Sequence, residues 1–343
     1  YADDPDSVAY QLLMQTLYLK HPRRWPVLGE RAAFDCLTRQ DVLDYHASRY
    51  VPNNVVLSIA GDVDAAEILS HLELLVEDLK SRPLNREPIP HEPHQFGSRR
   101  VRKEFAVPYS KLHLAWRLPC SAHPDTPALS ALSSILGGGR SARFYEKFHD
   151  RLGLVYSIEV HSNQSETDEG AFTISMDVDR AQRDKVRDLV LQELRNLAEE
   201  DFTEDLKRVC KQTRVSRLRR RSSASGVASE MGADWFGSRN LNLSSEWQEA
   251  IERVTTEDLH RVCSTWLSSP NVTEVSLDPP GSNAGDEERA SASAGTALSE
   301  HVLGNGMKVV IREDHRLPLA YACMAFKAGC RAENEHDLSL IHI

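Results

Sequence analysis

Leu136-Gly-Gly-Gly-Arg-Ser-Ala-Arg-Phe-Tyr145 and, shortly after it, Gly153-Leu-Val-Tyr-Ser157 are the stretches that decide the fold of this chain. Apolar side chains at helical spacing precede the first stretch, and its three glycines predict the end of that helix. Aromatic residues after the glycines predict a second, short helix. The second stretch predicts the beginning of a strand over residues 155–160.

Alternating patterns extend this unit in both directions along the chain. Apolar residues alternate with polar or small ones over 112–118 and again over 172–178, which is the period of half-buried strands. Helical spacing begins at Val186, and further helices are predicted to about Leu267. The sequence therefore predicts both strands and helices in this part of the chain.

Two stretches have the composition of linkers. Residues 82–95 contain four prolines, which exclude a regular helix or a central strand. Residues 281–299 are rich in Gly, Ala and Ser and carry a small acidic patch, so we expect an exposed, flexible segment. These linkers divide the chain into the pieces 1–81, 96–280 and 300–343.

A pattern in the first piece recurs in the second. A T-x-x-D helix start occurs at residues 38–41 and at 255–258, so the two threonines lie 217 residues apart. Each predicted helix is followed by a turn containing Pro-Asn and by an apolar strand, at 55–60 and at 272–277. We expect two related domains, and a strand at 55–60 that is buried on both faces. The alternative is a common helix–turn–strand unit that occurs twice.

The third piece begins with a hairpin signal. Asn305-Gly306 lies between alternating apolar residues, which is typical of a two-residue β-hairpin turn. A further strand is predicted over 317–326. A third unit therefore begins here.

Composition excludes some classes of protein. The net charge of −10 argues against a general nucleic-acid binder, and no apolar run is long enough to span a membrane. The six cysteines form no C-x-x-C pair, so we expect free thiols. The sequence predicts no particular compartment.

Several of these segments resemble the inverted-motif zinc metallopeptidases, the family of insulysin, pitrilysin and the mitochondrial processing peptidase. The stretches around the triple glycine and Tyr156 are the most characteristic, and the order and spacing of the others agree. The other matching segments are His21-Pro22, Pro26-Val-Leu-Gly29, Thr38-x-x-Asp41, Tyr50-x-Pro-Asn-Asn54, residues 55–62, Asn305-Gly306-Met307 and Ala328-Gly329-x-Arg-x-Glu333.

The resemblance implies an α+β fold of repeated metallopeptidase-like domains, each a mostly antiparallel sheet covered by helices. It implies four such domains in two halves that enclose a chamber. Residues 1–81 correspond to the C-terminal part of the first, catalytic-type domain, and 96–280 to the second, inactive-type domain. Residues 300–337 correspond to the start of the third. The tail 338–343 instead resembles the translation of a transposon end used in sequencing libraries, so we expect that it is not native protein.

The family holds zinc with a helix bearing H-x-x-E-H and a glutamate far downstream. None of the fourteen histidines lies in such a motif. His91 and His94 are close together, but they lie in the proline-rich linker, and we expect both to be solvated. The resemblance implies zinc ligands upstream of Tyr1. We therefore expect no metal ligand and no catalytic residue in this chain, and no activity of the chain alone.

One residue is a candidate for substrate binding. The family's domain opposite the zinc carries an arginine followed seven residues later by a tyrosine, and both reach the substrate backbone and the developing oxyanion. Tyr156 matches the tyrosine, but His149 occupies the arginine position, and Arg151 would point in another direction on a helix. We expect that the last domain of the parent carries the working pair. The alternative is that Tyr156 only packs in its sheet.

The sequence favours a fragment of a zinc-dependent endopeptidase that degrades or processes peptides in a closed chamber. Its partners would be a peptide or unfolded polypeptide and the other half of the same chain. One alternative is a non-catalytic relative, such as the core subunits of the respiratory cytochrome bc complex. Another is an α+β interaction module. An H-x-x-E-H motif upstream would separate the peptidase from these alternatives.

Overall fold

The computed structural model describes residues 3–84, 88–164, 169–267, 270–281, 298–312 and 322–324. The chain forms two compact units, Tyr1–Asp286 and Glu287–Ile343. Most of the expected linker 281–299, most of the strand expected at 317–326, the motif at 328–333 and the tail 338–343 lie outside the described residues.

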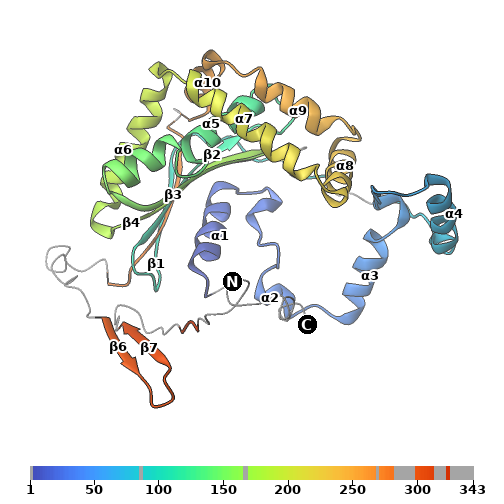
Figure 1. Cartoon of the computed structure of the whole chain (residues 1–343), viewed down its shortest axis with the longest axis horizontal. Helices are drawn as coiled ribbons and strands as arrows, with labels where there is room; N and C mark the ends of the chain where they lie inside the picture. Colours follow the sequence, from blue (N-terminus) through green and yellow to red (C-terminus); the bar gives the residue numbers. More distant parts are fainter. Residues whose placement is uncertain are drawn as a thin grey trace. The chain divides into compact units, whose positions relative to one another are not determined.

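The first unit contains a five-stranded sheet in the order β1-β5-β2-β4-β3 (Figure 1). Strand β1 pairs parallel to β5, and the other three pairings are antiparallel. The prediction of a mostly antiparallel sheet is therefore confirmed. The strands are β1 (Arg99–Glu104), β2 (Ser110–Leu118), β3 (Val155–Asn163), β4 (Gly170–Val178) and β5 (Thr273–Asp278).

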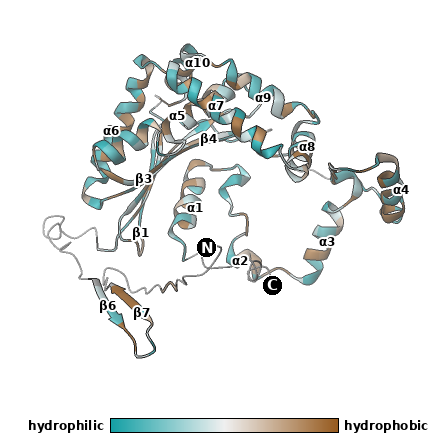
Figure 2. Ribbon diagram, viewed as in Figure 1, coloured by the Kyte–Doolittle hydropathy of each residue, from teal (hydrophilic) through white to brown (hydrophobic). Residues whose placement is uncertain are grey.

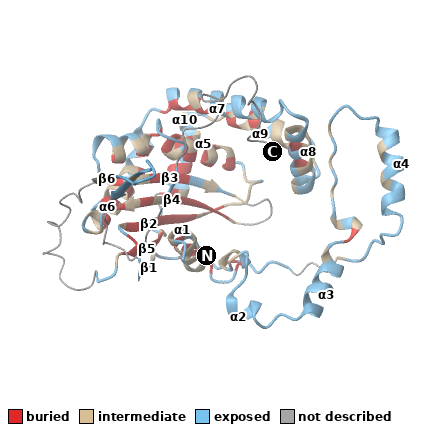
Figure 3. Cartoon of the chain, turned by 60° about the horizontal axis from the view of Figure 1, so that its bottom comes forward, coloured by how far each residue is buried: buried red, intermediate tan, exposed pale blue. Residues whose placement is uncertain are grey.

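Helices cover one face of this sheet. The alternating side chains from Leu112 to Leu118 point into a core with the helices, and Trp116 lies edge-on to Phe172 within it. Figure 3 shows the central strands as the most deeply buried elements. The helical elements on this side are α5 (Thr126–Gly137), η3 (Tyr145–Arg151), α6 (Arg183–Asn196), α7 (Thr203–Arg220), α9 (Leu243–Glu252), α10 (Thr256–Val262) and η6 (Cys263–Leu267).

Helix α1 (Pro5–Leu17) covers part of the opposite face of the sheet. Its apolar side packs on small and β-branched residues of three strands, Ala115, Ala171 and Val275. The buried Tyr18 follows the helix and donates its hydroxyl proton to the carbonyl of Gly170 (3.0 Å). A helix from the first piece of the sequence thus contributes to the core of the second.

The connection between these pieces is fixed by a buried carboxylate. Glu92 is only 3% exposed, and its carboxylate accepts hydrogen bonds from the backbone N–H groups of Leu19, Lys20 and His21 at 2.7–2.9 Å. Burial alone would raise the pKa of Glu92, but the three N–H groups outweigh burial and hold the pKa below its ordinary value. The chain after α1 is therefore held against the proline-rich segment.

Replacing Glu92 by glutamine should lower the free energy of unfolding by about 2 kcal/mol, because charge-assisted hydrogen bonds become neutral ones and an amide N–H₂ faces backbone donors. Urea denaturation at neutral pH measures this loss. The exposed Glu73 provides the matched control, and Glu73→Gln should change stability by less than about 0.5 kcal/mol. Equal stabilities of the two variants would contradict the role assigned to Glu92.

Both predicted helix starts are confirmed. Helix α3 (Arg39–Arg49) begins with a capping box between Thr38 and Asp41, and α10 begins with the same box between Thr255 and Asp258. Strand β5 then follows α10 as expected. Adding the same spacing of 217 residues to the bounds of α1 gives a range that overlaps α8 (Ala224–Ser238). The helices α1 and α8 therefore occupy equivalent positions in the two repeats of the pattern.

The prediction of a β-strand at residues 55–60 is wrong. The backbone is extended at Val55 (φ −116°, ψ 139°), but no strand is assigned there, and Val55 and Leu57 are 61% and 64% exposed. A β-strand requires a neighbour that pairs with its N–H and C=O groups, and this segment pairs with no strand of the described residues. The Ser58 hydroxyl donates a hydrogen bond to the Ala228 carbonyl on α8 (2.7 Å).

Helix α4 also exposes apolar side chains. It spans Ala65–Val76, and Leu69, Leu74 and Leu75 are 59%, 72% and 78% exposed (Figures 2 and 3). Helix α2 (Arg31–Phe34) is short and likewise contributes no buried residue. Among the described residues, this part of the chain therefore has no surface that buries its apolar side.

The predicted hairpin of the second unit is confirmed. Strands β6 (Leu298–Val302) and β7 (Lys308–Arg312) pair antiparallel, and Gly306 in the turn has φ +84°, which favours glycine. No helix in the described part of the chain is long and apolar enough to cross a membrane.

Candidate functional site

Tyr156 lies at a β-bulge at the beginning of the edge strand β3. The pairing register with β4 shifts between Val155 and Ser157, so Tyr156 is the extra residue. A bulge redirects its side chain relative to a regular strand, and Tyr156 is 57% exposed. Its hydroxyl donates a hydrogen bond to Asp179 Oδ1 at 2.9 Å.

An aromatic and charged cluster surrounds this tyrosine. The ring of Tyr109 lies 5.3 Å from that of Tyr156, and Lys111 Nζ lies 5.5 Å from the centre of the Tyr109 ring. Lys111 also forms ion pairs with Asp177 (3.1 Å) and with Asp6 of α1 (2.7 Å). Burial would lower the pKa of Lys111, but the two carboxylates outweigh burial and raise it. Lys111 therefore remains a cation near the Tyr109 ring.

His149 and Arg151 both have partners near them in the sequence. His149 Nδ1 lies 2.7 Å from Asp150 Oδ1, and its ring stacks on Tyr145 with a centroid distance of 4.3 Å. Arg151 pairs with Glu146 at 2.5 Å. All five residues belong to η3. His149 has no guanidinium group, and the guanidinium of Arg151 is paired with Glu146. Neither residue therefore supplies the family's arginine beside Tyr156.

This geometry limits the chemistry of Tyr156. A phenol stabilises an oxyanion by donating its proton, and the proton of Tyr156 is directed at the Asp179 carboxylate. Binding an oxyanion would require the loss of that hydrogen bond. The side chain is 57% exposed, so the ring is accessible for contact with a polypeptide.

The described residues do not fit a zinc ion. His91 and His94 are exposed, and the intervening Glu92 carboxylate is occupied by three backbone N–H groups. In the described part of the chain, no group of three or more His, Cys, Asp or Glu side chains is placed to hold a metal. Burial raises the pKa of the Cys263 thiol to about 12, so this thiol is a poor ligand.

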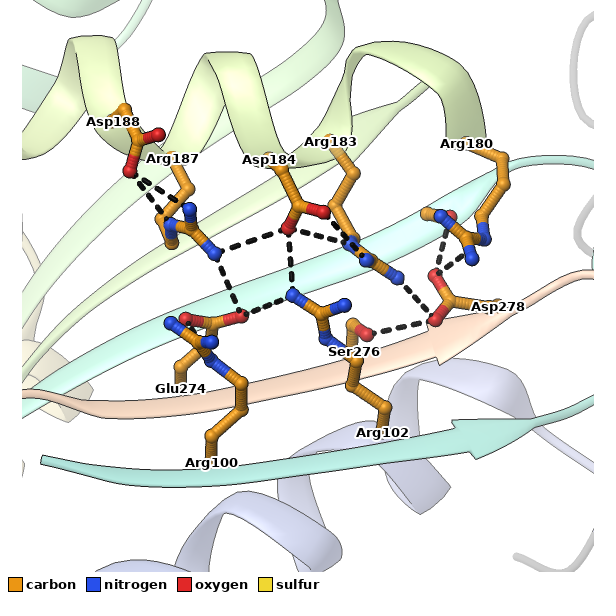
Figure 4. Close-up of polar contacts among 11 residues, drawn as sticks. Arg100, Arg102, Arg180, Arg183, Asp184, Arg187, Asp188, Glu274, Ser276 and Asp278 are labelled. Carbon is orange, nitrogen blue, oxygen red and sulfur yellow. Dashed lines mark hydrogen bonds and ion pairs between the residues drawn. The ribbon is translucent and has the colours of Figure 1, made fainter. Parts of the chain in front are cut away.

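A charged network on the helix-covered face was not predicted (Figure 4). Arg183 is almost fully buried and donates to Asp278 Oδ2 at 2.5 Å, and Glu274 is held by arginines of β1 and α6. The available signal was the alternation of polar residues in β1 and β5 on the side that faces helices. The network comprises Arg100, Arg102, Ser110, Arg180, Arg183, Asp184, Arg187, Asp188, Glu274, Ser276 and Asp278.

Comparison with known proteins identifies the family. The family described as "Peptidase M16 inactive domain" matches residues 37–212, which is more than half of the chain. The chain belongs to the peptidase M16 family. This confirms the expected insulinase-type family and its α+β fold.

Relatives of this M16 chain are distant in sequence. It is 24% identical over 285 residues to the "Zinc protease PqqE" of Helicobacter pylori, covering 81% of this chain and 63% of that protein. It is 23% identical over 279 residues to an "Uncharacterized zinc protease" of Rickettsia felis, covering 78% and 64%. The chain thus spans less than two thirds of the length of these relatives.

Solved structures share the fold of the M16 chain. A protease from Helicobacter pylori has a TM-score of 0.72 at 24% identity, covering 81% of this chain and 68% of that one. The peptidase M16 inactive domain from Pseudomonas fluorescens also has a TM-score of 0.72, at 21% identity and 81% and 66% coverage. A chain of complex III2 from Candida albicans has a TM-score of 0.66 at 16% identity, with 80% and 67% coverage.

Proposed function

We propose that this chain supplies the inactive domain of a zinc-dependent endopeptidase whose zinc is held by another part of the protein. The match of residues 37–212 to the M16 inactive domain carries this proposal. Relatives named zinc proteases, aligned over most of the chain, support the activity of the parent. The substrate would be a peptide or unfolded polypeptide, and the chain alone would be inactive.

The proposed parent divides the chain as follows. Residues 1–81 would close the first, catalytic-type domain, 96–280 would form the inactive-type domain and 300–337 would begin a third. The match to the inactive-domain family begins earlier than this division, at residue 37. The exposed apolar residues of 55–60 and α4 support the first assignment, because they need a sheet and a core that the described residues do not provide. The other half of the parent would be a partner of this chain.

A non-catalytic role is the second candidate. The structural similarity to a chain of complex III2 from Candida albicans favours it, because the fold also occurs in a respiratory complex. Reading the coding sequence around this chain separates the two. An H-x-x-E-H motif in the first domain supports the peptidase, and a first domain without that motif supports the scaffold.

We propose that Tyr156 contacts substrate without acting on the oxyanion. Its proton is directed at Asp179, and His149 replaces the family's arginine. In the full-length enzyme, Tyr156→Phe should therefore change kcat by less than about threefold. The equivalent change in the last domain should lower kcat by about a hundredfold or more, the usual cost of losing an oxyanion donor.

Steady-state cleavage of a quenched fluorescent peptide measures both variants, with Tyr109→Phe as a matched aromatic control. A hundredfold loss of kcat from Tyr156→Phe, with unchanged thermal stability, would place this domain in the active site. It would leave the zinc assignment of the parent untouched.

A further inference from the structure

A cavity of about 330 Å³ lies at one edge of the sheet, away from Tyr156. It is open to solvent on one side and is lined by the first residues of β1, the chain entering β5, α6 and the end of η6. Its size is in the range of pockets that bind small molecules. It is lined by Ser98, Arg99, Arg100, Arg187, Asp188, Leu191, Arg195, Leu267, Pro270, Val272 and Glu274.

The polar part of this lining carries more positive than negative groups. Four arginines face two carboxylates, and both carboxylates are already paired. Glu274 accepts from Arg100 Nε at 2.9 Å and lies 3.6 Å from Arg187, whereas Asp188 holds Arg187 at 2.9 Å. Glu274 is 2% exposed, and the buried charge of its carboxylate is compensated by Arg100 and Arg187.

Two further arginines of the lining differ in what their guanidinium groups contact. Arg99 donates from Nη1 to the carbonyls of Thr16 and Leu17 in α1, both at 2.9 Å, so its donors are directed at the face of the sheet that α1 covers. Arg195 is exposed in the last turn of α6 and forms no ion pair in the described part of the chain. Arg100 contacts Glu274 through Nε. The guanidinium of Arg195 and the Nη groups of Arg100 therefore supply donors for an oxyanion.

The rest of the lining is apolar. Leu191, Leu267, Pro270 and Val272 form a wall beside the arginines. We propose that this cavity binds a small organic anion, with a phosphate or carboxylate head on Arg195 and Arg100 and an apolar body against these four residues. The whole chain carries a net charge of −10, so an excess of arginine at this cavity is a local feature and does not follow from the overall composition.

Phenyl phosphate, titrated into the 343-residue chain by isothermal calorimetry, tests this site. We expect a dissociation constant of about 0.1–1 mM, an ordinary affinity for a ligand of this size. Benzoate should bind measurably, whereas phenol and inorganic phosphate should each bind at least about tenfold more weakly than phenyl phosphate. Arg195→Gln should weaken binding about tenfold through loss of a charge-assisted contact. The exposed Arg220 on α7 provides the matched control, and Arg220→Gln should leave binding unchanged.

Two results would overturn the proposal. One is the absence of saturable binding below about 10 mM, well above the affinity expected for such a ligand. The other is equal binding by the wild type and by both Arg195→Gln and Arg100→Gln, with circular dichroism showing that the variants are folded. Equal affinity for inorganic phosphate and phenyl phosphate would exclude the apolar subsite and refute the site as proposed.

Discussion

Replacing Asp278 by alanine should destabilise the sheet domain by about 3–5 kcal/mol, the usual effect of removing one partner of a buried ion pair. Asp278 ends β5 and is 3% exposed. Its carboxylate accepts from the hydroxyl of Ser110 (2.6 Å) and the guanidinium of Arg183 (2.5 Å). Without it, the Arg183 side chain, 1% exposed, keeps only its contacts with Asp184. The large effect comes from that buried cation.

A double-mutant cycle tests this cause by urea denaturation. Arg183→Met removes the cation, so the variant with both Asp278→Ala and Arg183→Met should recover a substantial part of the stability lost by Asp278→Ala alone. The exposed pair Lys207–Glu204 is the matched control, and Glu204→Ala should cost about 0–1 kcal/mol. A loss below about 1 kcal/mol for Asp278→Ala would contradict the network as described.

Acid should destabilise the same domain through His113, between about pH 6.5 and pH 4. His113 belongs to β2 and its side chain is buried. Its Nδ1 lies 2.9 Å from the hydroxyl of Ser175 on the neighbouring strand β4. Burial, with a smaller contribution from Lys111, lowers the pKa of His113 to about 4, against the opposing influence of Asp177 and Asp6. The folded state therefore keeps a neutral imidazole where the unfolded chain is already protonated.

The sign follows from the bound protons. Below about pH 6.5 the unfolded state binds the proton more strongly, so stability falls by about 1.4 kcal/mol per pH unit until the folded pKa is reached. The total loss attributable to His113 is about 3 kcal/mol, and it is absent above pH 6.5.

Denaturation at several pH values measures this loss against two variants. His113→Gln should lose about 3 kcal/mol less than the wild type between pH 7 and pH 4. His161→Gln, at an exposed position of β3, should retain the pH dependence of the wild type. Parallel pH profiles for the wild type and His113→Gln would show that this imidazole does not couple protonation to folding.

Local chemistry determined the parts of the fold that the sequence predicted well. The alternation at 112–118 reflects a strand with one face in the helix-covered core, and each T-x-x-D start supplies its own cap within four residues. The Asn305-Gly306 turn needs only its own backbone conformation. None of these features depends on distant parts of the chain.

Features that depend on distant partners were missed or wrong. Residues 55–60 have the composition of a buried strand, but pairing requires a neighbour that the described residues do not provide. The sequence made no prediction for Glu92, whose carboxylate accepts from backbone N–H groups more than seventy residues earlier. The Arg183–Asp278 pair joins residues 95 positions apart. Such partners cannot be inferred from spacing.

At the candidate site, too, the residue could be predicted from the sequence, whereas its contacts with distant partners could not. Tyr156 was predicted from a resemblance, and its role in substrate binding stays a prediction. The β-bulge and the hydrogen bond to Asp179 could not be predicted, because both arise from the register between β3 and β4. They strengthen the expectation that the oxyanion is stabilised by another domain, because the Tyr156 proton already has an acceptor.

Zinc affinity and peptide cleavage, measured side by side for this chain and for the full-length protein, test the proposed function most directly. Competition with a chromophoric chelator gives the zinc affinity, and a quenched fluorescent peptide gives the activity. We predict no submicromolar zinc site and no cleavage for the 343-residue chain, and both for the full-length protein, with activity abolished by 1,10-phenanthroline. Submicromolar zinc binding by this chain, traced to its His and Glu side chains, or a zinc-free and inactive full-length protein, would contradict the proposal.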